Sequence, residues 1–304
     1  MYSYPSNYNK NFNPSGLPYS VMLSETLDFQ ARMTAAGGNL LSDVELNAIN
    51  YWISQYKYYN LWDRMIAYYP LVGGNGGAGS LASFTINLKS SSYTLLNAGG
   101  VTNAMCNTTG FKNTGSTANG STVIFNTQIN DSTALNIFNK GMSCYIRSND
   151  TVATAYYDMG CYTSTYNNLH LLSVNNNGPG VLSGGISDYW GGSALVATNL
   201  EAARFYADKV PIQGFYSGAR KDRDLTLFKN GVILTQGKTN TIVGVNQNIY
   251  LNTGMRDTNL CTNVSLRTYG SWAIHQAYTP SEEVRRTVIE QNFQNLLGRA
   301  ISIS

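Results

Sequence analysis

Charged side chains are scarce in this sequence. Asp, Glu, Lys and Arg make up 12% of its 304 residues, roughly half their usual share in soluble globular proteins. Asn, Ser, Thr, Gly and 22 tyrosines supply the polarity instead. The formal net charge is +3, and basic residues stand next to acidic ones, as in the segment 220–223. No basic stripe suited to a phosphate backbone is present, so the composition argues against nucleic acid as a partner.

The sequence also lacks long apolar runs and a recognisable export signal. No apolar stretch reaches the roughly 20 residues that a membrane-spanning helix needs. Residues 1–5 have neither the basic start nor the apolar core of a secretory signal peptide. These two absences predict that the chain neither inserts into a membrane nor leaves the cell by the usual secretory route.

Cysteine and histidine are too few and too widely spaced for a metal site. The sequence has no Cys-x-x-Cys pair, and only two histidines are present to complete a ligand set. Buried free thiols are the default for such cysteines, ahead of a disulfide or a zinc site. We therefore predict no metal or cofactor at Cys106, Cys144, Cys161, Cys261, His170 or His275. Calcium stays open, because Asp188, Asp222, Asp224 and Asp257 suit calcium-binding loops, although no spaced ligand motif supports it.

The residues that catalysis requires are missing as well. A glycosidase needs two carboxylates across the scissile bond, yet Glu201 is the only glutamate between residues 70 and 278. His170 lies in a predicted strand, where a hydrogen-bonded histidine is commoner than a catalytic base, and His275 precedes the last predicted helix. The glycines at 73–79 lack the Lys-Ser or Lys-Thr of a phosphate-binding loop. We predict that the chain is not an enzyme and has no catalytic residues.

Helical patterns occupy the segment before residue 70. The first covers about residues 25–36 and ends at Gly37, followed by a second glycine. The second starts at a capping box, in which the Ser42 oxygen accepts the amide of Glu45 and the glutamate accepts the serine amide. Three- and four-residue spacing then gives an apolar face, and a helical continuation is expected after a break at residues 59–60. The apolar positions are Ile49, Trp52, Ile53 and Tyr56, continued by Leu61, Trp62, Met65 and Ile66.

A third helix is predicted near the end of the chain. Thr279 is its cap, Pro280 takes the first helical position and Glu282 completes a second capping box. Gly298 ends the helix, which we expect to pack near the N-terminal helices. Its predicted apolar face consists of Val284, Val288, Ile289, Phe293, Leu296 and Leu297.

Residues 80–278 have the texture of a β protein, in which short apolar or alternating runs are separated by Gly and Asn. The clearest runs are 225–229 and 232–234. Asn230-Gly231 between them supplies the two positive φ values of a type I′ hairpin turn. Many strands without intervening helices predict a mainly β protein with an antiparallel jelly-roll β-sandwich. The other candidate strands are 83–88, 122–126, 142–147, 155–161, 168–174, 213–217, 248–252 and 264–272.

The first 23 residues read as an extended arm. They show no period of 2 or 3.6, and prolines interrupt them. Aromatic rings bury nothing on a free tail, whereas they gain stability if the arm lies against another subunit. A loose terminus is the alternative that the residues leave open. The aromatic positions of the arm are Tyr2, Tyr4, Tyr8, Phe12 and Tyr19.

Neutral polar and aromatic residues near predicted loops suit the binding of sugars. Aromatic faces stack on pyranose rings, and a few placed polar groups fix a ligand's orientation. Tyr189-Trp190, followed by two glycines, is the most suggestive cluster. Ordinary core and rim aromatics of a sandwich are the alternative reading. The ligand-binding candidates are Tyr162, Tyr166, Asn167, Asp188, Tyr189 and Trp190, with Tyr206 and Tyr216 in similar positions.

Several motifs resemble a group of bacteriophage virion proteins. The matching stretches are FQARMTAAGG at 29–38, Glu45 with Ala48-Ile49, NLWDRM at 60–65, YPLVGG at 69–74, and shorter ones at 87–89, 126–127, 132–133, 225–231, 293–294 and 297–299. The resemblance covers nearly the whole chain after the arm. The group is typical of phages and prophages of Bacteroidetes and similar hosts, and its central part is similar to the concanavalin A-like, laminin G-like lectin fold.

The resemblance implies a lectin-like module carried on the phage particle as a fibre, spike or capsid-surface component. It implies a virion location after assembly in the host cytoplasm, other virion proteins as partners, and a homo-oligomer, namely a trimer. The expected organisation is an anchoring arm at 1–23, a helical lead-in at 24–70, a concanavalin A-like β-sandwich at 80–278 and a C-terminal helix at 279–298. The Glu-x-Asp metal-site strand of legume lectins is absent, which argues against calcium-dependent sugar binding.

Three functions are consistent with these patterns. The preferred one is a structural virion protein that is attached through its arm and displays the sandwich on the head or tail, where it binds host-surface glycan. The second is a decoration or joining protein without sugar binding, whose 162–166 and 189–190 regions are buried against a neighbour. The third is a glycan depolymerase, which requires two acidic side chains about 5–10 Å apart in a groove.

Overall fold

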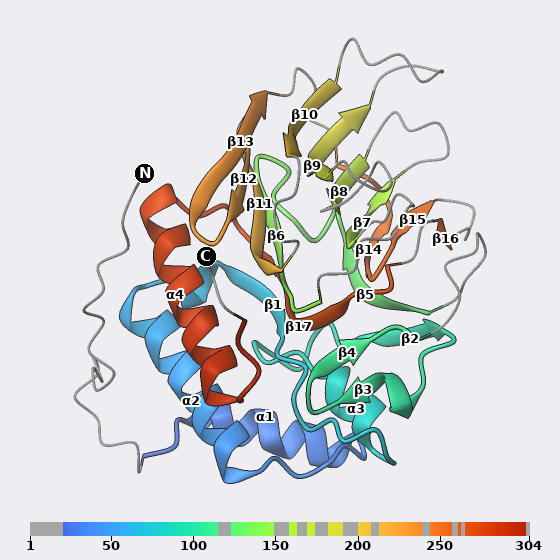
Figure 1. Cartoon of the computed structure of the whole chain (residues 1–304), viewed down its shortest axis with the longest axis vertical. Helices are drawn as coiled ribbons and strands as arrows, with labels where there is room; N and C mark the ends of the chain where they lie inside the picture. The colour runs from blue at the N-terminus through green and yellow to red at the C-terminus, as the bar shows by residue number, and fades with distance from the viewer. Residues whose placement is uncertain are drawn as a thin grey trace.

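Two β-sheets face each other in the computed structural model, with helices along one side and at one end (Figure 1). The predicted arm residues Tyr2, Tyr4, Tyr8, Phe12 and Tyr19 lie outside the described residues, as do Tyr166, Asn167 and Asp257. The structure describes residues 21–114, 123–148, 158–162, 169–173, 182–190, 200–207, 213–238, 244–256, 261–262 and 265–301.

Sheet A contains eight described strands in the order β13-β12-β11-β6-β17-β4-β3, and β1 pairs with β17 outside this path. All of its pairings are antiparallel. The type I′ hairpin prediction is confirmed, because Asn230 and Gly231 between β12 and β13 have φ values of 51° and 77°. The strands are β1 (Met65–Tyr69), β3 (Cys106–Asn107), β4 (Gly110–Lys112), β6 (Asn139–Ile146), β11 (Gly214–Lys221), β12 (Asp224–Lys229), β13 (Val232–Lys238) and β17 (Thr268–His275).

Sheet B contains nine described strands, with the main order β10-β9-β8-β7-β14-β5-β2. Its pairings are antiparallel except for β15 on β7, which is parallel. The prediction of a mainly β, antiparallel two-sheet fold with helices at both ends is confirmed. The strands are β2 (Leu96–Gly99), β5 (Ile124–Asn130), β7 (Met159–Tyr162), β8 (Leu169–Ser173), β9 (Leu182–Trp190), β10 (Leu200–Ala207), β14 (Asn248–Leu251), β15 (Gly254–Arg256) and β16 (Cys261–Thr262).

The larger hydrophobic core fills the space between the sheets. At its centre the rings of Phe111, Phe125 and Trp272 contact one another, with the centroids of the two phenylalanines 5.3 Å apart in an edge-to-face arrangement. Such aromatic pairs contribute about 0.5–1.5 kcal/mol beyond the area they bury. The thiols of Cys106, Cys144 and Cys161 are free and buried here, as predicted for these three cysteines.

The helices follow their predicted caps. Both capping boxes are present, at Ser42 with Glu45 and at Thr279 with Glu282. Gly37 and Gly298 have φ values of 77° and 67°, as helix-ending glycines do. The helices are α1 (Ser24–Ala35), α2 (Asp43–Tyr58), the short α3 (Ser80–Phe84) and α4 (Pro280–Leu296). Within the described residues no helix is long and apolar enough to cross a membrane.

Two predicted elements are wrong. Residues 61–66 do not continue as a helix but form a short 3-10 turn, η1 (Trp62–Arg64), followed by β1. The apolar run of β1 is paired along β17, from Met65 opposite His275 to Tyr69 opposite Trp272. The predicted strand 83–88 instead begins inside α3, and the Phe84 ring at the end of this helix packs so closely on Gly74 that a Cβ there would lie 2.6 Å from it. At β1 a partner strand about 200 residues along the chain decides the backbone.

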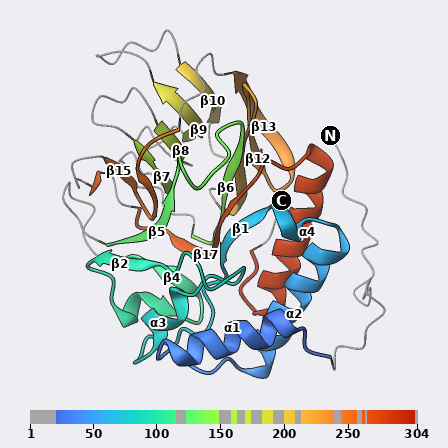
Figure 2. The same cartoon turned by 180° about the vertical axis from the view of Figure 1, so that it is seen from behind.

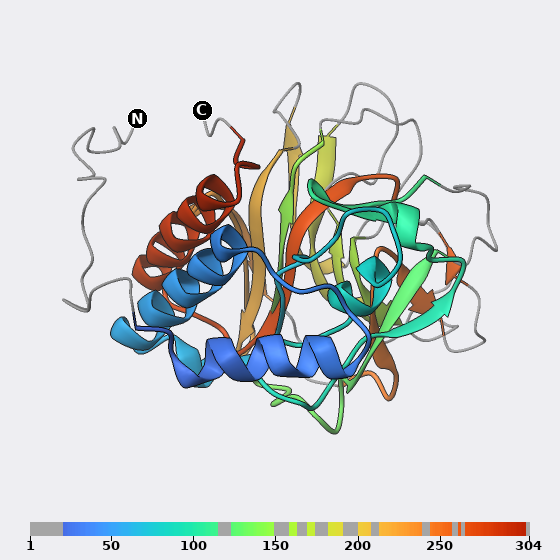
Figure 3. The same cartoon turned by 90° about the horizontal axis from the view of Figure 1, so that it is seen from below.

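A second core joins the helices to the outer face of sheet A. Trp52 of α2 is stacked between Tyr56 and Tyr68, with ring centroids 3.8 and 3.9 Å apart. Figure 3 shows α2 and α4 side by side on this face, with sheet B on the far side of sheet A. The expected packing of the C-terminal helix near the N-terminal helices is therefore confirmed.

The buried face of α4 contains charged and amide side chains as well as apolar ones. Of the predicted apolar face, Ile289 and Phe293 are buried, but Val284 and Leu296 are about half exposed. The positions turned inward include charged and amide side chains that are fully buried, namely Glu283, Arg286, Glu290 and Gln294. The apolar-face prediction for this helix is thus right for Ile289 and Phe293 and wrong for Val284 and Leu296. The outer face of sheet A offers hydroxyl groups to the charged side chains that it missed.

Each buried charge of α4 has several partners. Arg286 Nη1 donates to Glu283 Oε1 at 2.7 Å and Nη2 donates to the Ser143 hydroxyl of β6 at 2.9 Å. Glu290 accepts hydrogen bonds from the hydroxyls of Ser271 (2.6 Å) and Tyr68 (2.8 Å). A buried pair of this kind is stable only when its remaining donors and acceptors are satisfied. These bonds therefore fix α4 in one position on the sheet.

Replacing Glu283 by Gln should destabilise the fold, because it leaves the buried Arg286 guanidinium without a counter-charge. We expect the free energy of unfolding, measured by urea titration, to fall by about 3–5 kcal/mol. The exposed neighbour provides the control, and Arg285→Met should cost less than about 1 kcal/mol. The double variant Glu283→Leu/Arg286→Met removes both charges and should recover most of the loss. A double variant as unstable as the single one would contradict this account.

Candidate functional site

The predicted ligand residues that the structure describes lie at one end of sheet B. Tyr162 is the last residue of β7, and Asp188, Tyr189 and Trp190 are the last residues of β9. Both strands pair antiparallel with β8 between them, so they run in the same direction and end at the same edge of the sheet. We call this region the β7–β9 end. The backbone therefore brings together residues that are far apart in sequence.

The sequence placed these residues on or near loops, and the structure places them in strands, most of them at or near the strand ends. Tyr189, Trp190 and Tyr206 lie within strands β9 and β10, and Tyr216 lies in β11 and is buried. Strand β9 was not among the predicted strands, and its partners β8 and β10 hold it extended. The β9–β10 register shifts so that Asp188 is an extra residue. Such bulges occur often next to functional sites because they change the direction of the strand.

The β7–β9 end lies far from the helices. Strands β8, β9 and β10 occupy one end of the molecule's long axis and α1 the other, in both Figure 1 and Figure 2. The N-terminal segment joins the fold at the α1 end, where Asn50 of α2 holds it. The Asn50 side chain accepts from the Leu23 amide at 2.8 Å and donates to the Val21 carbonyl at 3.2 Å. The molecule thus has two ends, the α1 end, at which the N-terminal segment joins, and the β7–β9 end.

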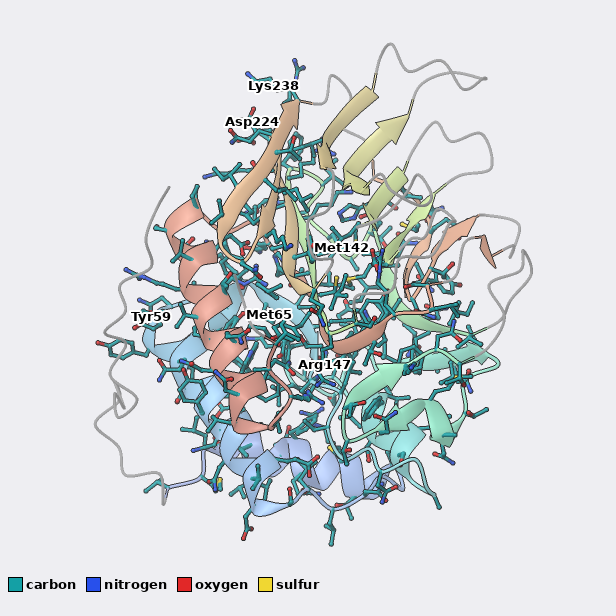
Figure 4. The ribbon with its side chains drawn as sticks, in the orientation of Figure 1. Tyr59, Met65, Met142, Arg147, Asp224 and Lys238 are labelled. Carbon is teal, nitrogen blue, oxygen red and sulfur yellow. The ribbon has the colours of Figure 1, made fainter. Side chains whose placement is uncertain are left out.

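A groove of about 720 Å³ lies on sheet A, between strands β11–β13 and the residues that lead into α4. We call it the α4 groove. Its sheet side carries Lys221, Asp224 and Lys238, and Arg64 and Tyr278 stand opposite. Figure 4 places Asp224 and Lys238 at the upper end of the β12–β13 hairpin, the end of the molecule at which β9 also stops. Sequence reasoning missed this groove because its two sides come from distant segments.

The helix side of the α4 groove is held rigidly. Arg64 donates from both Nη atoms to the Glu282 carboxylate, and its guanidinium stacks on the Tyr278 ring, 4.5 Å from the centroid. Partial burial acts to raise the pKa of Glu282, but hydrogen bonds from Arg64 and Thr279 outweigh it and lower the pKa to about 2. Glu282 is therefore ionised at neutral pH and keeps Arg64 in place.

A second groove of about 450 Å³ lies at the α1 end, between the α1–α2 connection and residues 71–75. Leu40, which is 76% exposed, and Val44 of α2 lie beside it. Each of the two grooves is lined by one acidic residue among the described ones, Asp224 in the α4 groove and Glu45 in this one. Neither shows the pair of facing carboxylates that a glycosidase uses.

His170 belongs to a buried ion cluster between the sheets. Asp131 lies 2.7 Å from His170 Nδ1 and accepts from Lys140 Nζ at 2.8 Å, and all three side chains are fully buried. Burial lowers the pKa of His170 to about 4. Burial would raise the pKa of Asp131, but the charge of Lys140 and the bond to His170 lower it below its ordinary value. The histidine is neutral at pH 7 and donates its Nδ1 proton to the carboxylate.

His275 is also buried, and burial together with the charge of Arg286 lowers its pKa well below the ordinary value. The prediction of a hydrogen-bonded His170 is confirmed, and the structure places its ring in the core. No group of three or more His, Cys, Asp or Glu side chains in the described part of the chain is arranged to hold a metal ion.

Acid should destabilise the protein in a defined window. The unfolded chain takes up protons on histidine below about pH 6.5, whereas folded His170 does so only near pH 4. The free energy of unfolding should therefore fall as the pH drops through this window, by up to about 1.4 kcal/mol per pH unit for each buried histidine. Urea titrations at several pH values should show that the free energy of unfolding changes less with pH for His170→Gln than for the wild type. The remaining pH dependence is then due to His275. An unchanged slope would refute the assignment to His170.

Comparison with known proteins gives structural likenesses only. No protein-family model matches the chain, and no curated protein matches it. A botulinum neurotoxin type G receptor binding domain superposes with a TM-score of 0.44 and 16% identity, over 75% of this chain and 52% of the other. The Ruminococcus gnavus IT-sialidase CBM40 bound to α2,3-sialyllactose gives a TM-score of 0.33 and 13% identity, over 49% of this chain and 80% of the other.

The binding domain of botulinum neurotoxin DC in complex with SialylT gives a TM-score of 0.36 and 10% identity, over 55% of this chain and 39% of the other. This chain therefore spans about half or less of the length of the two toxin domains. Similarities at this level do not identify a function.

Proposed function

We propose that this chain is a structural protein of a phage virion that is attached through its N-terminal arm and displays its β-sandwich outward to bind host-surface glycan. The observation that supports this proposal is that the two ends of the molecule carry different features. The N-terminal segment joins at the α1 end, while the predicted ligand residues lie at the opposite, β7–β9 end. A molecule held at one end presents the other to its surroundings.

The α1 end suits attachment. Asn50 fixes the segment that follows the arm, and Thr26 adds a hydrogen bond to the same side chain at 3.0 Å. Exposed apolar side chains stand at the same end, including Leu40 and Val44. Apolar side chains gathered on a soluble surface mark contacts with other proteins. In the proposed particle this end faces other virion subunits, and the chain is a homo-oligomer.

The β7–β9 end suits a neutral ligand with many hydroxyl groups. Tyr162, Tyr189 and Trp190 are residue types that stack on sugar rings, and Asp188 is a type that accepts hydrogen bonds from hydroxyls. The strand pairing holds their backbones in a fixed register, which lowers the entropy cost of binding.

Replacing Trp190 by Ala should weaken glycan binding, because a stacked ring is lost at the β7–β9 end. We expect the affinity for glycans of the host surface, found on a glycan array and measured by surface plasmon resonance, to fall at least about tenfold, or about 1.4 kcal/mol. Tyr58→Ala serves as the control, since Tyr58 is an aromatic residue that is 51% exposed at the end of α2 in the helical layer. Equal melting temperatures would show that the variants are folded. Unchanged binding by Trp190→Ala would place the glycan elsewhere.

Cryo-electron microscopy of the particle distinguishes display from a purely structural role. The proposal expects residues 21–66 in contact with other virion proteins and β9 facing solvent. If β9 is instead buried between subunits, the chain is a joining protein that never meets a sugar.

A further inference from the structure

We propose that the α4 groove is a second saccharide site, separate from the β7–β9 end, and that it takes saccharides carrying carboxylate groups. The inference deepens the proposed function and rests on it for the choice of a saccharide as ligand. The α4 groove has a volume of about 720 Å³, which lies within the usual range for small-molecule sites. A short oligosaccharide therefore fits.

The charges of the groove favour an anionic ligand. Lys221 is exposed at its rim and has no ion pair among the described residues. Lys238 lies 3.9 Å from Asp224, but the two side chains are 81% and 68% exposed. Surface pairs of this kind contribute little to stability, so Lys238 can exchange Asp224 for a carboxylate of the ligand. Arg64 is neutralised by Glu282, which leaves the two lysines as the cations available to a ligand.

The floor of the groove suits the apolar face of a sugar ring. Ala219 and Ala277, whose side chains are small, and the aromatic residues Phe228 and Tyr278 line the groove, and all four are buried. The exposed amide of Gln236 stands at the rim, where it can bond hydroxyl groups. A saccharide with carboxylates therefore finds an apolar floor, a neutral amide and two ammonium groups in one place.

Both sides of the groove are fixed before any ligand arrives. On the sheet side, Asp224 pairs with Lys238 and Thr226 with Gln236 in the β12–β13 ladder. On the helix side, the capping box of α4 and the Arg64 contact with Glu282 hold residues 277–280. Fixed walls cost little entropy on binding. The groove is thus a built feature of the fold.

Titration calorimetry on the full chain with matched probes tests the inference. The acidic probes are a hexasaccharide of alternating glucuronic acid and N-acetylglucosamine, and a galacturonic acid hexamer, and the neutral probe is an N-acetylglucosamine hexamer. We expect at least one acidic probe to bind at least about tenfold more tightly than the neutral one at 50 mM salt. This preference should shrink as salt screens the lysines.

Single charge reversals locate the site. Lys221→Glu and Lys238→Glu should each weaken binding of the acidic probe at least about tenfold, and Thr226→Trp should block it by filling the groove. Lys112→Glu is the matched control, because Lys112 is an exposed lysine on β4, outside the groove. Trp190→Ala should leave the acidic probe unaffected, which separates this site from the β7–β9 end.

Several results would overturn the inference. These are the absence of binding by either acidic probe, equal binding of the neutral probe, or unchanged binding by the Lys221 and Lys238 variants. Loss of acidic binding in Trp190→Ala with retention in Lys221→Glu would assign all saccharide binding to the β7–β9 end. Failure of the proposed function gives a different result. Glycan-array binding would then be unchanged by Trp190→Ala, while binding of the acidic probe would still fall in the Lys221 and Lys238 variants.

Discussion

The buried charges on the underside of α4 are the constraint on which the arrangement of the molecule depends. Arg286 and Glu290 each require several partners, and these come from β6, β17, β1 and α2 at once. An apolar helix face tolerates small slides along a sheet, whereas this set of hydrogen bonds is satisfied in a single position. The helical layer therefore covers one face of sheet A in a defined way and contacts the Gly231 turn of the β12–β13 hairpin, while Asp224 and Lys238 at the other end of the hairpin stay exposed.

The same helical layer connects the N-terminal segment to the β-sandwich. Trp52 stacks between Tyr56 and Tyr68, and its indole N–H donates to Glu290, so α2, β1 and α4 form one unit. Asn50 on α2 then holds the segment that leads to the arm. The N-terminal segment, the second core and the underside of α4 are thus mechanically connected, and the β-sandwich extends away from them. A force applied through the arm would reach sheet A through this connection.

Local signals in the sequence predicted local structure well. Ser42 with Glu45, Thr279 with Glu282, and Asn230-Gly231 each determine a cap or a turn through neighbouring atoms, and all three are present. The strand at 65–69 and the buried polar face of α4 could not be read in the same way, because each depends on a partner more than 60 residues away. For the site, the sequence indicated which residue types stand at the ends of β7 and β9, but not that β8 brings those ends together. No local sequence pattern predicted the α4 groove.

The hydrogen bond between Trp52 and Glu290 joins residues 238 positions apart. During synthesis at 5–20 residues per second, Trp52 leaves the ribosome on the order of ten to fifty seconds before its partner exists. Through that interval the apolar face of α2 and the unpaired strand β1 have no surface to cover them. A chain cut short before α4 would keep this apolar surface and strand edge exposed, and such surfaces make incomplete chains prone to aggregate.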